Sequence, residues 1–160
     1  MRYSNRDFGF RAAFVVIGLT LVAAGGCRNA APDAPTIQVF KTATCGCCTQ
    51  WIDHLEAAGF EVKAKDLPDL TQLKSENGVP AELASCHTAL VDGYVLEGHV
   101  PAADIERLLA ERPAVAGLAV PDMPLGSPGM EHPDPSRHQP YNVMSFGKDG
   151  VRVFASHPAN

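Results

Sequence analysis

The sequence has 160 residues, a formal net charge of −5 at pH 7 and 46% hydrophobic residues. This length suits one domain with its own core. The acidic balance, without a basic stripe, argues against a nucleic-acid-binding protein, so we expect neither RNA nor DNA as a partner.

Residues 1–26 are predicted to be a signal peptide, because arginines precede an apolar run that is too short for a confident membrane span. Small residues then lead directly into Cys27, a pattern that resembles a bacterial lipoprotein processing site, although Ala24 stands where leucine is usual. We predict export to the periplasm, with a lipid on Cys27 as the sole attachment to a membrane. Ordinary cleavage near Gly26 or Ala30 is the alternative.

Residues 27–35 are predicted to form a Pro/Ala-rich tether, and residues 36–160 the domain itself. The domain begins with alternating apolar residues, continues with apolar residues at helical spacing and then alternates again. These patterns predict a strand at 36–40, a helix at 48–58 and a strand at 60–65. Gly59 is placed to end the helix in a left-handed conformation. The order predicts a parallel βαβ unit.

The middle of the domain predicts a short helix that Asn77-Gly78 ends, followed by one further turn at 80–83. Asp92-Gly93 is a two-residue hairpin signal between predicted strands at 88–91 and 94–97, and a helix is expected from Pro101 to Arg112. The sum, β-α-β, a variable helical stretch and β-β-α, predicts an α/β domain with a thioredoxin-like order.

The rest of the chain is predicted to be a loop and hairpin extension of that domain. Residues 121–140 are rich in Pro and Gly and carry Met123 and Met130. Two further alternating runs, at 142–146 and 151–154, predict a C-terminal hairpin.

Three of the five cysteines, Cys45, Cys47 and Cys48, fall between the first predicted strand and the helix that follows it. The N-terminus of a helix favours a thiolate, which is both a nucleophile and a soft metal ligand. Cys45 and Cys48 form the C-x-x-C pair of dithiol oxidoreductases. Because Cys47 would compete in any mixed disulfide, we favour metal binding over general disulfide exchange.

The spacing of these thiols favours copper over zinc. Adjacent cysteines cannot easily aim both sulfurs at one tetrahedral ion, whereas thiolates that bridge two Cu(I) ions need not converge on one centre. We therefore expect a multinuclear Cu(I)–thiolate cluster. Dithiol redox chemistry without metal, and zinc or purely structural bonding, stay open.

In a thioredoxin-like topology the residues before the third strand meet the turn that carries Cys45, Cys47 and Cys48, which we call the thiol turn. This would bring Cys86 and His87 to the three clustered cysteines. Met123 and Met130 are candidate secondary ligands, because thioethers are soft and need not deprotonate. His99 is interpreted as an ordinary polar residue.

The motifs resemble those of the CopG-like family, long described as a domain of unknown function. The resemblance rests on Cys45-Gly46-Cys47-Cys48, Val79-Pro80-Ala81-Glu82-Leu83, Ser85-Cys86-His87-Thr88-Ala89, the stretch from Gly93 to Ala102, and the stretch from Ala119 to Glu131. It implies a thioredoxin-like fold, export to the periplasm and a role in copper resistance in which the cysteines hold a Cu(I) cluster. It leaves open whether members are enzymes, electron-transfer partners or metal buffers.

We therefore expect a periplasmic protein that sequesters or relays Cu(I), with copper ions and other periplasmic copper-handling proteins as partners. The alternative is a thiol–disulfide or copper oxidoreductase that uses Cys45 and Cys48. A purely structural module with stapled thiols is a third possibility.

Overall fold

The computed structural model describes residues 35–159. The predicted signal peptide, Cys27 and all of the tether except Pro35 lie outside the described residues. The elements are β1 (Ile37–Lys41), α1 (Gly46–Ala57), β2 (Val62–Asp66), α2 (Thr71–Glu76), the 3-10 helix η1 (Ala81–Leu83), β3 (Thr88–Val91), β4 (Tyr94–Glu97), α3 (Ala102–Glu111), β5 (Gly117–Ala119), the 3-10 helix η2 (Pro135–Arg137), β6 (Tyr141–Gly147) and β7 (Gly150–His157). The order predicted from the sequence is confirmed, apart from β5 and η2.

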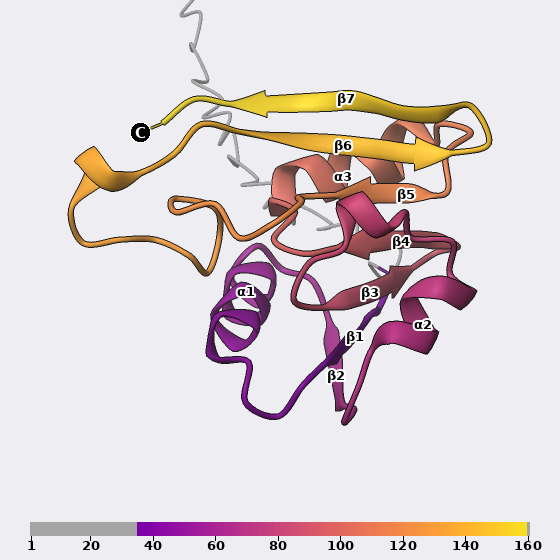
Figure 1. Ribbon diagram of the computed structural model, residues 1–160, viewed down its shortest axis with the longest axis horizontal. Coiled ribbons are helices and arrows are strands. Elements are labelled where there is room, and N and C mark those ends of the chain that lie inside the picture. The colour runs from indigo at the N-terminus through magenta and orange to yellow at the C-terminus, as the bar shows by residue number, and fades with distance from the viewer. Residues whose placement is uncertain (1–34, 160) are drawn as a thin grey trace, which may run out of the picture. The chain divides into compact units, whose positions relative to one another are not determined.

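The seven described strands form one mixed sheet in the order β2-β1-β3-β4-β5-β6-β7 (Figure 1). β1 is parallel to β2, as expected of strands joined by a crossover helix, and β3 pairs antiparallel with both β1 and β4. The thioredoxin-like topology stays a prediction. The α/β class is confirmed.

The sequence analysis missed β5, which it left between the predicted helix and the C-terminal loop. β5 is only three residues long and pairs parallel with β4 and antiparallel with β6. The predicted C-terminal hairpin is confirmed, and both of its strands are longer than expected. Through β5 the hairpin extends the same sheet instead of forming a separate layer.

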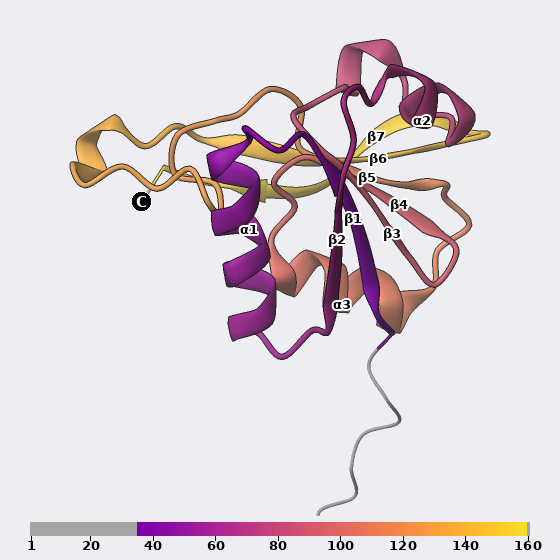
Figure 2. The same ribbon diagram turned by 90° about the horizontal axis from the view of Figure 1, so that it is seen from below.

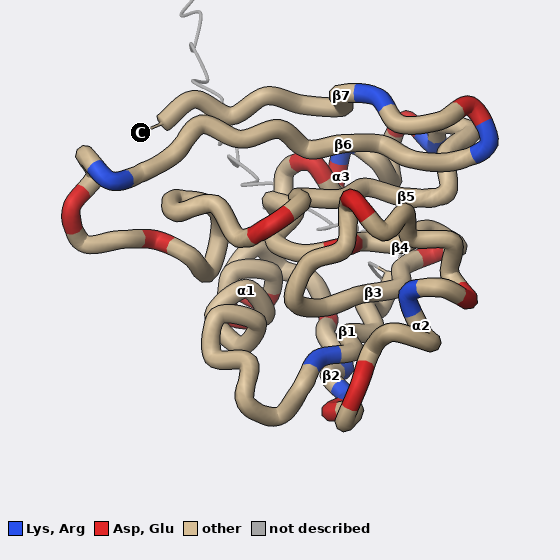
Figure 3. The backbone as a smooth tube through the Cα atoms, viewed as in Figure 1, with Lys and Arg blue, Asp and Glu red and all other residues tan. Residues whose placement is uncertain are grey.

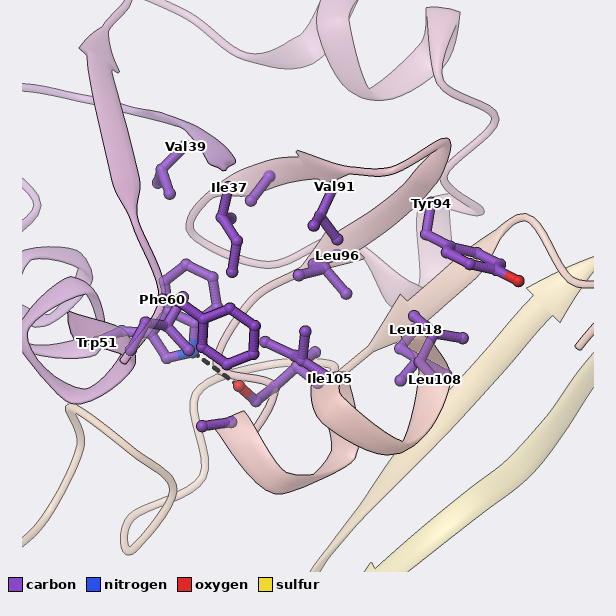
Figure 4. Packing of buried hydrophobic residues seen from close by; sticks show 14 of the residues in the cluster. Ile37, Val39, Trp51, Phe60, Val91, Tyr94, Leu96, Ile105, Leu108 and Leu118 are labelled. Atoms are coloured by element: carbon purple, nitrogen blue, oxygen red, sulfur yellow. Dashed lines mark hydrogen bonds between the residues drawn. The ribbon is translucent and has the colours of Figure 1, made fainter. Parts of the chain in front are cut away.

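Helices cover both faces of the sheet. Figure 2 shows α1 and α2 on opposite sides of β1. The larger hydrophobic cluster lies on the α1 and α3 face, where Trp51 and Ile105 pack against inward residues of the strands such as Val39 (Figure 4). The indole of Trp51 also donates a hydrogen bond to the carbonyl of Val100 at 2.8 Å. The smaller cluster, which includes Leu83 and Val95, lies on the opposite face.

Because side chains alternate along a strand, the two faces of β4 differ. Leu96 belongs to the larger cluster, whereas Val95 belongs to the smaller one. Glu97 therefore points to the same side as Val95, toward α2. This direction brings the Glu97 carboxylate to Lys74 of α2.

Two predicted turns have the backbone conformation, with positive φ, that the sequence indicated. Asp92 and Gly93 both have positive φ, at 48° and 85°, which is the tight two-residue turn that matches strand twist. Gly59 follows α1 with φ 95°. The first of these turns sets the register of β3 against β4, with Val91 opposite Tyr94 and Thr88 opposite Glu97.

Across residues 35–159, the helices are all too short or too polar to span a bilayer. The chain between Lys41 and Asp53, which makes the turn from β1 into α1, contains no charged residue (Figure 3). The three clustered cysteines lie in this uncharged segment.

Candidate metal centre

The thiol turn connects the end of β1 to the start of α1. Cys45 is the N-cap residue of α1, with an extended backbone, and its N–H donates to the carbonyl of Thr42 at 3.1 Å. Cys47 and Cys48 follow in the first helical turn. Cys48 is fully buried in the core, whereas Cys45 and Cys47 are half-buried. The turn therefore presents sulfur atoms to the surface while one of them is anchored inside.

Two of these cysteines are joined. Cys45 and Cys48 form a disulfide across a separation of three residues, and Cys47 and Cys86 are the free thiols among the described residues. The sulfur of Cys47 lies 3.6 Å from that of Cys45. The C-x-x-C pair is thus in its oxidised state, with a third thiol in contact with it.

Cys86 reaches the same place from the loop between η1 and β3. Because β3 pairs with β1, with Thr88 opposite Phe40, the residues before β3 lie beside the turn that follows β1. The sulfurs of all four cysteines, Cys45, Cys47, Cys48 and Cys86, lie within 4.8 Å of one another. The predicted meeting of the two segments is confirmed.

Cys86 is a poor acid in this setting. Burial, and next the neighbouring Cys47, raise the pKa of the Cys86 thiol to about 12. The thiol therefore stays protonated at neutral pH, and a metal that binds it has to displace the proton.

Two imidazoles adjoin Cys86. Its sulfur lies 3.3 Å from Nδ1 of His87 and 3.0 Å from Nε2 of His99. Both rings are fully buried, and one ligand atom from each of the three residues falls within 4.8 Å of the others. Nδ1 of His99 lies 2.6 Å from the carbonyl oxygen of Pro128. Since that oxygen accepts only, Nδ1 carries the proton and Nε2 presents its lone pair to Cys86.

The histidines favour the neutral state. Burial, and next the proximity of His99 and Lys74, hold the pKa of His87 well below its usual value. Burial likewise lowers the pKa of His99, against a smaller opposite effect of its bond to Pro128. Nε2 of His87 is buried without a hydrogen-bond partner among the described residues. A neutral imidazole with a free lone pair is the form that binds metal.

The interpretation of His99 as an ordinary polar residue is wrong, because the structure places it in the interior against Cys86. The sequence contained a signal that could have found it. The Asp92-Gly93 turn pairs Thr88 with Glu97, and the same register continued by two residues sets His99 beside Cys86.

The loop of residues 121–140, which we call the methionine loop, lies against the thiol turn through its backbone. Gly129 has φ 80°, and a Cβ there would come within 2.7 Å of the Cys47 carbonyl oxygen and the Trp51 nitrogen. Met130 follows directly and is half-buried, whereas Met123 is 47% exposed. Neither methionine belongs to the cysteine and histidine groups described above, so their role as ligands stays a prediction.

A buried carboxylate lies beside the segment that carries Cys86 and His87. Glu97, fully buried at the end of β4, accepts hydrogen bonds from the Ser85 N–H at 2.6 Å and the Thr88 hydroxyl at 2.7 Å, and forms an ion pair with Lys74. Burial raises the pKa of Glu97, while the hydrogen bond and charge of Lys74 act in the opposite direction. The sequence analysis did not single out Glu97 or Lys74.

Two solved structures are similar to this chain. They are named "Copper resistance protein copG- Form 2" and "Copper resistance protein copG- Form 1", and each is 48% identical to the chain with a TM-score of 0.73. The matches cover 78% of this chain and 99% and 98% of the solved chains, respectively. A family model described as "Protein of unknown function, DUF411" matches residues 83–130. The search of the curated proteins found no match.

Proposed function

The chain belongs to the CopG family of copper resistance proteins, and we propose that it binds Cu(I) as its cargo on a cluster of cysteine thiolates. The observation that carries the proposal is the convergence of four sulfurs, from Cys45, Cys47, Cys48 and Cys86, within 4.8 Å of one another. Thiolate sulfur is a soft ligand, and Cu(I) is one of the metals that such ligands favour.

The chemistry of the donor set favours several bridged copper ions over one zinc ion. Cys47 and Cys48 are adjacent in the first turn of α1, and only one of the pair faces the core. Two such sulfurs serve a single tetrahedral centre poorly, whereas bridging thiolates can each contact a different Cu(I) ion. The protein would then hold more than one copper per chain and sequester or relay it.

Neutral histidines fit the same cargo. Nδ1 of His87 and Nε2 of His99 both lie beside the sulfur of Cys86, and Nε2 of His87 is buried without a partner among the described residues. Nitrogen ligands complement thiolates around copper. Met123 and Met130 remain the proposed secondary ligands, since their loop rests on the thiol turn through Gly129. His99 is added to the ligand set on structural grounds.

The disulfide supports a coupling of copper binding to redox state. While Cys45 and Cys48 are bonded to each other, two of the four sulfurs cannot act as thiolates. A partner dithiol that is itself oxidised to a disulfide would supply the two electrons and two protons that convert this bond into two thiols, and their deprotonation completes the ligand set. The oxidised state would be the low-affinity form and the reduced state the copper-binding form.

The same disulfide favours a second candidate function, that of a thiol–disulfide or copper oxidoreductase. In the thiol reaction the Cys45/Cys48 dithiol would give two electrons to a partner disulfide, which becomes two thiols while Cys45 and Cys48 become bonded. Half-buried Cys45, at the N-terminus of α1, would be the attacking thiolate.

We further propose that the protein works in the periplasm and meets other copper-handling proteins there. The predicted signal peptide supports this location, and a lipid on Cys27 would hold the protein to the membrane there. Fractionation of cells that produce Cys27→Ala tests the anchor, because the variant should become soluble and still bind copper. If the variant stays membrane-bound, the apolar segment is an uncleaved anchor.

Anaerobic titration of the reduced protein with Cu(I), in competition with bicinchoninate, tests the main proposal. We expect more than one copper per chain and poor competition by zinc. Cys86→Ser, which is nearly isosteric, should lower copper stoichiometry or affinity while the domain stays folded. Saturation by a single equivalent of zinc in the presence of Cu(I) would contradict the proposal. Parent-like copper binding by Cys86→Ser would confine the site to the thiol turn.

A further inference from the structure

The short segment that carries Cys86 and His87 is held at both of its ends by one buried side chain. Oε1 of Glu97 accepts the N–H of Ser85 at 2.6 Å, and Oε2 accepts the hydroxyl of Thr88 at 2.7 Å. The two donors are the residues immediately before and after the Cys86-His87 pair. Glu97 therefore fixes the backbone from which both candidate ligands project.

The charge of Glu97 is compensated by a lysine of α2, the helix on the side of the sheet to which Glu97 points. Lys74 of α2, whose side chain is 14% exposed, forms an ion pair with the carboxylate and donates to Oγ1 of Thr88 at 3.0 Å. Burying a carboxylate without a cationic partner costs free energy, so the ion pair with Lys74 is what allows the Glu97 carboxylate to be buried. The network joins α2, β4 and the start of β3.

Ser85 has little freedom to move away from this carboxylate. Its hydroxyl donates to the carbonyl of Asp122 at 2.5 Å, which ties it to the methionine loop. Gly98 lies directly against it, since a Cβ at that glycine would come within 2.5 Å of the Ser85 hydroxyl and 2.6 Å of the Val120 carbonyl. Ser85 is held from three directions, and Glu97 supplies the bond to its backbone.

We propose that Glu97 is a positioning residue of the metal centre, which acts through the N–H of Ser85 to aim Cys86 and His87 at the thiol turn. The expected effect on copper affinity rests on the proposed function. The expected effect on the position of Cys86 does not, because it concerns the metal-free protein. Ligands that are ordered before the metal arrives lose less conformational freedom on binding, so loss of this anchor weakens binding without removing a ligand.

A matched pair of double variants separates the acceptor from the charge. Lys74→Met/Glu97→Gln removes both charges and keeps an amide oxygen for Ser85, whereas Lys74→Met/Glu97→Leu removes both charges and the acceptor. Both variants remove the two charges together, so neither leaves a buried charge unpaired, and both are suited to folding. Thr88→Val, which keeps the ion pair and deletes one donor, is a milder variant. Glu76→Gln on the exposed part of α2 is the control.

The first readout is Cu(I) affinity by chelator competition. We expect the Leu-containing double variant to lose roughly 10- to 100-fold, as for other residues that orient ligands, and the Gln-containing one to stay close to the parent. Thr88→Val should shift affinity in the same direction by less, and the control should not change. Equal losses in both double variants, or no loss in either, would overturn the proposal.

The second readout needs no copper. In the oxidised protein Cys47 and Cys86 are free, and peptide-resolved alkylation gives a rate for each. We expect the Leu-containing variant to raise the rate of Cys86 several-fold relative to Cys47, because only the Cys86 segment loses its anchor. A proportional rise of both rates would indicate general loosening and refute the positioning role. If the parent binds no copper, the proposed function fails while this readout still decides the role of Glu97.

Discussion

The sulfur of Cys86 lies 3.0 Å from Nε2 of His99, although thirteen positions separate them in the chain. The contact is made by the β3–β4 hairpin, whose two-residue turn aligns the segments that precede and follow it. It places a half-buried thiol and a fully buried, neutral imidazole beside the thiol turn.

His99→Gln should weaken Cu(I) binding roughly 10- to 100-fold, because it removes a neutral nitrogen that faces Cys86 and whose tautomer Pro128 fixes. Chelator competition on the reduced protein measures the effect. His157→Gln serves as the control, since His157 bonds to Asp104 outside the cluster. Parent-like affinity of His99→Gln would restrict the copper ligands to sulfur.

The alkylation rate of Cys86 should change with pH over a more alkaline range than that of an ordinary cysteine. Because its pKa is raised to about 12, its alkylation rate should keep rising with pH well beyond 9.0, the ordinary value for a cysteine. Cys47, measured in the same protein, is the internal comparison. A plateau of the Cys86 rate near pH 9 would show that the thiol is less shielded than the structure indicates.

The same shift predicts how the stability of the metal-free protein changes in alkali. The folded state keeps the Cys86 proton where the unfolded chain has released it, so this contribution to stability is complete below about pH 9 and is lost as pH rises toward 12. Urea unfolding at a series of pH values measures it. Cys86→Ser should show a flatter decline over that window.

Gly129→Ala should lift the methionine loop from the thiol turn. Its added Cβ would meet backbone atoms of Cys47 and Trp51, and its φ of 80° disfavours any L side chain. Gly59→Ala is the matched control, since Gly59 has φ 95° but open space around it. The control should lose about 1–2 kcal/mol of unfolding free energy from backbone strain alone. Urea unfolding should show a larger loss for Gly129→Ala; an equal loss would mean that the close approach is not essential.

Copper loading should protect Cys45 and Cys48 from oxidation, because these sulfurs cannot bond to each other while they bridge metal ions. Reduced protein with and without Cu(I) would be exposed to oxidised glutathione, and the disulfide followed by mass spectrometry. We expect slower disulfide formation in the loaded protein. Identical rates would count against a link between redox state and copper binding.

Much of the fold could be predicted because the decisive signals are local. Alternation and helical spacing located β1, α1 and the β3–β4 hairpin, and turn chemistry at Asp92-Gly93 set the hairpin register. The short strand β5 could not be predicted, since three residues carry too little periodicity and their strand conformation depends on pairing with β4 and β6.

The sequence by itself determined the sulfur chemistry of this protein. Three cysteines in four positions at the start of a helix indicate a soft-metal or redox site in any fold that keeps that helix, because thiol type and spacing are properties of the chain. The predicted strand order added Cys86 and His87 to this set, because it brings the residues before the third strand to the three clustered cysteines.

Only the tertiary structure decided which other groups surround these sulfurs. Glu97 is the last residue of β4 and His99 follows two residues later, and residue type alone distinguishes neither from a solvated side chain. The pairing of β3 with β1 and β4, and the packing of α2 below, bury them beside Cys86 and Ser85. Burial then lowers the pKa of His99 and raises the pKa values of Cys86 and Glu97, because low-dielectric surroundings disfavour charge and exist only once the chain has folded.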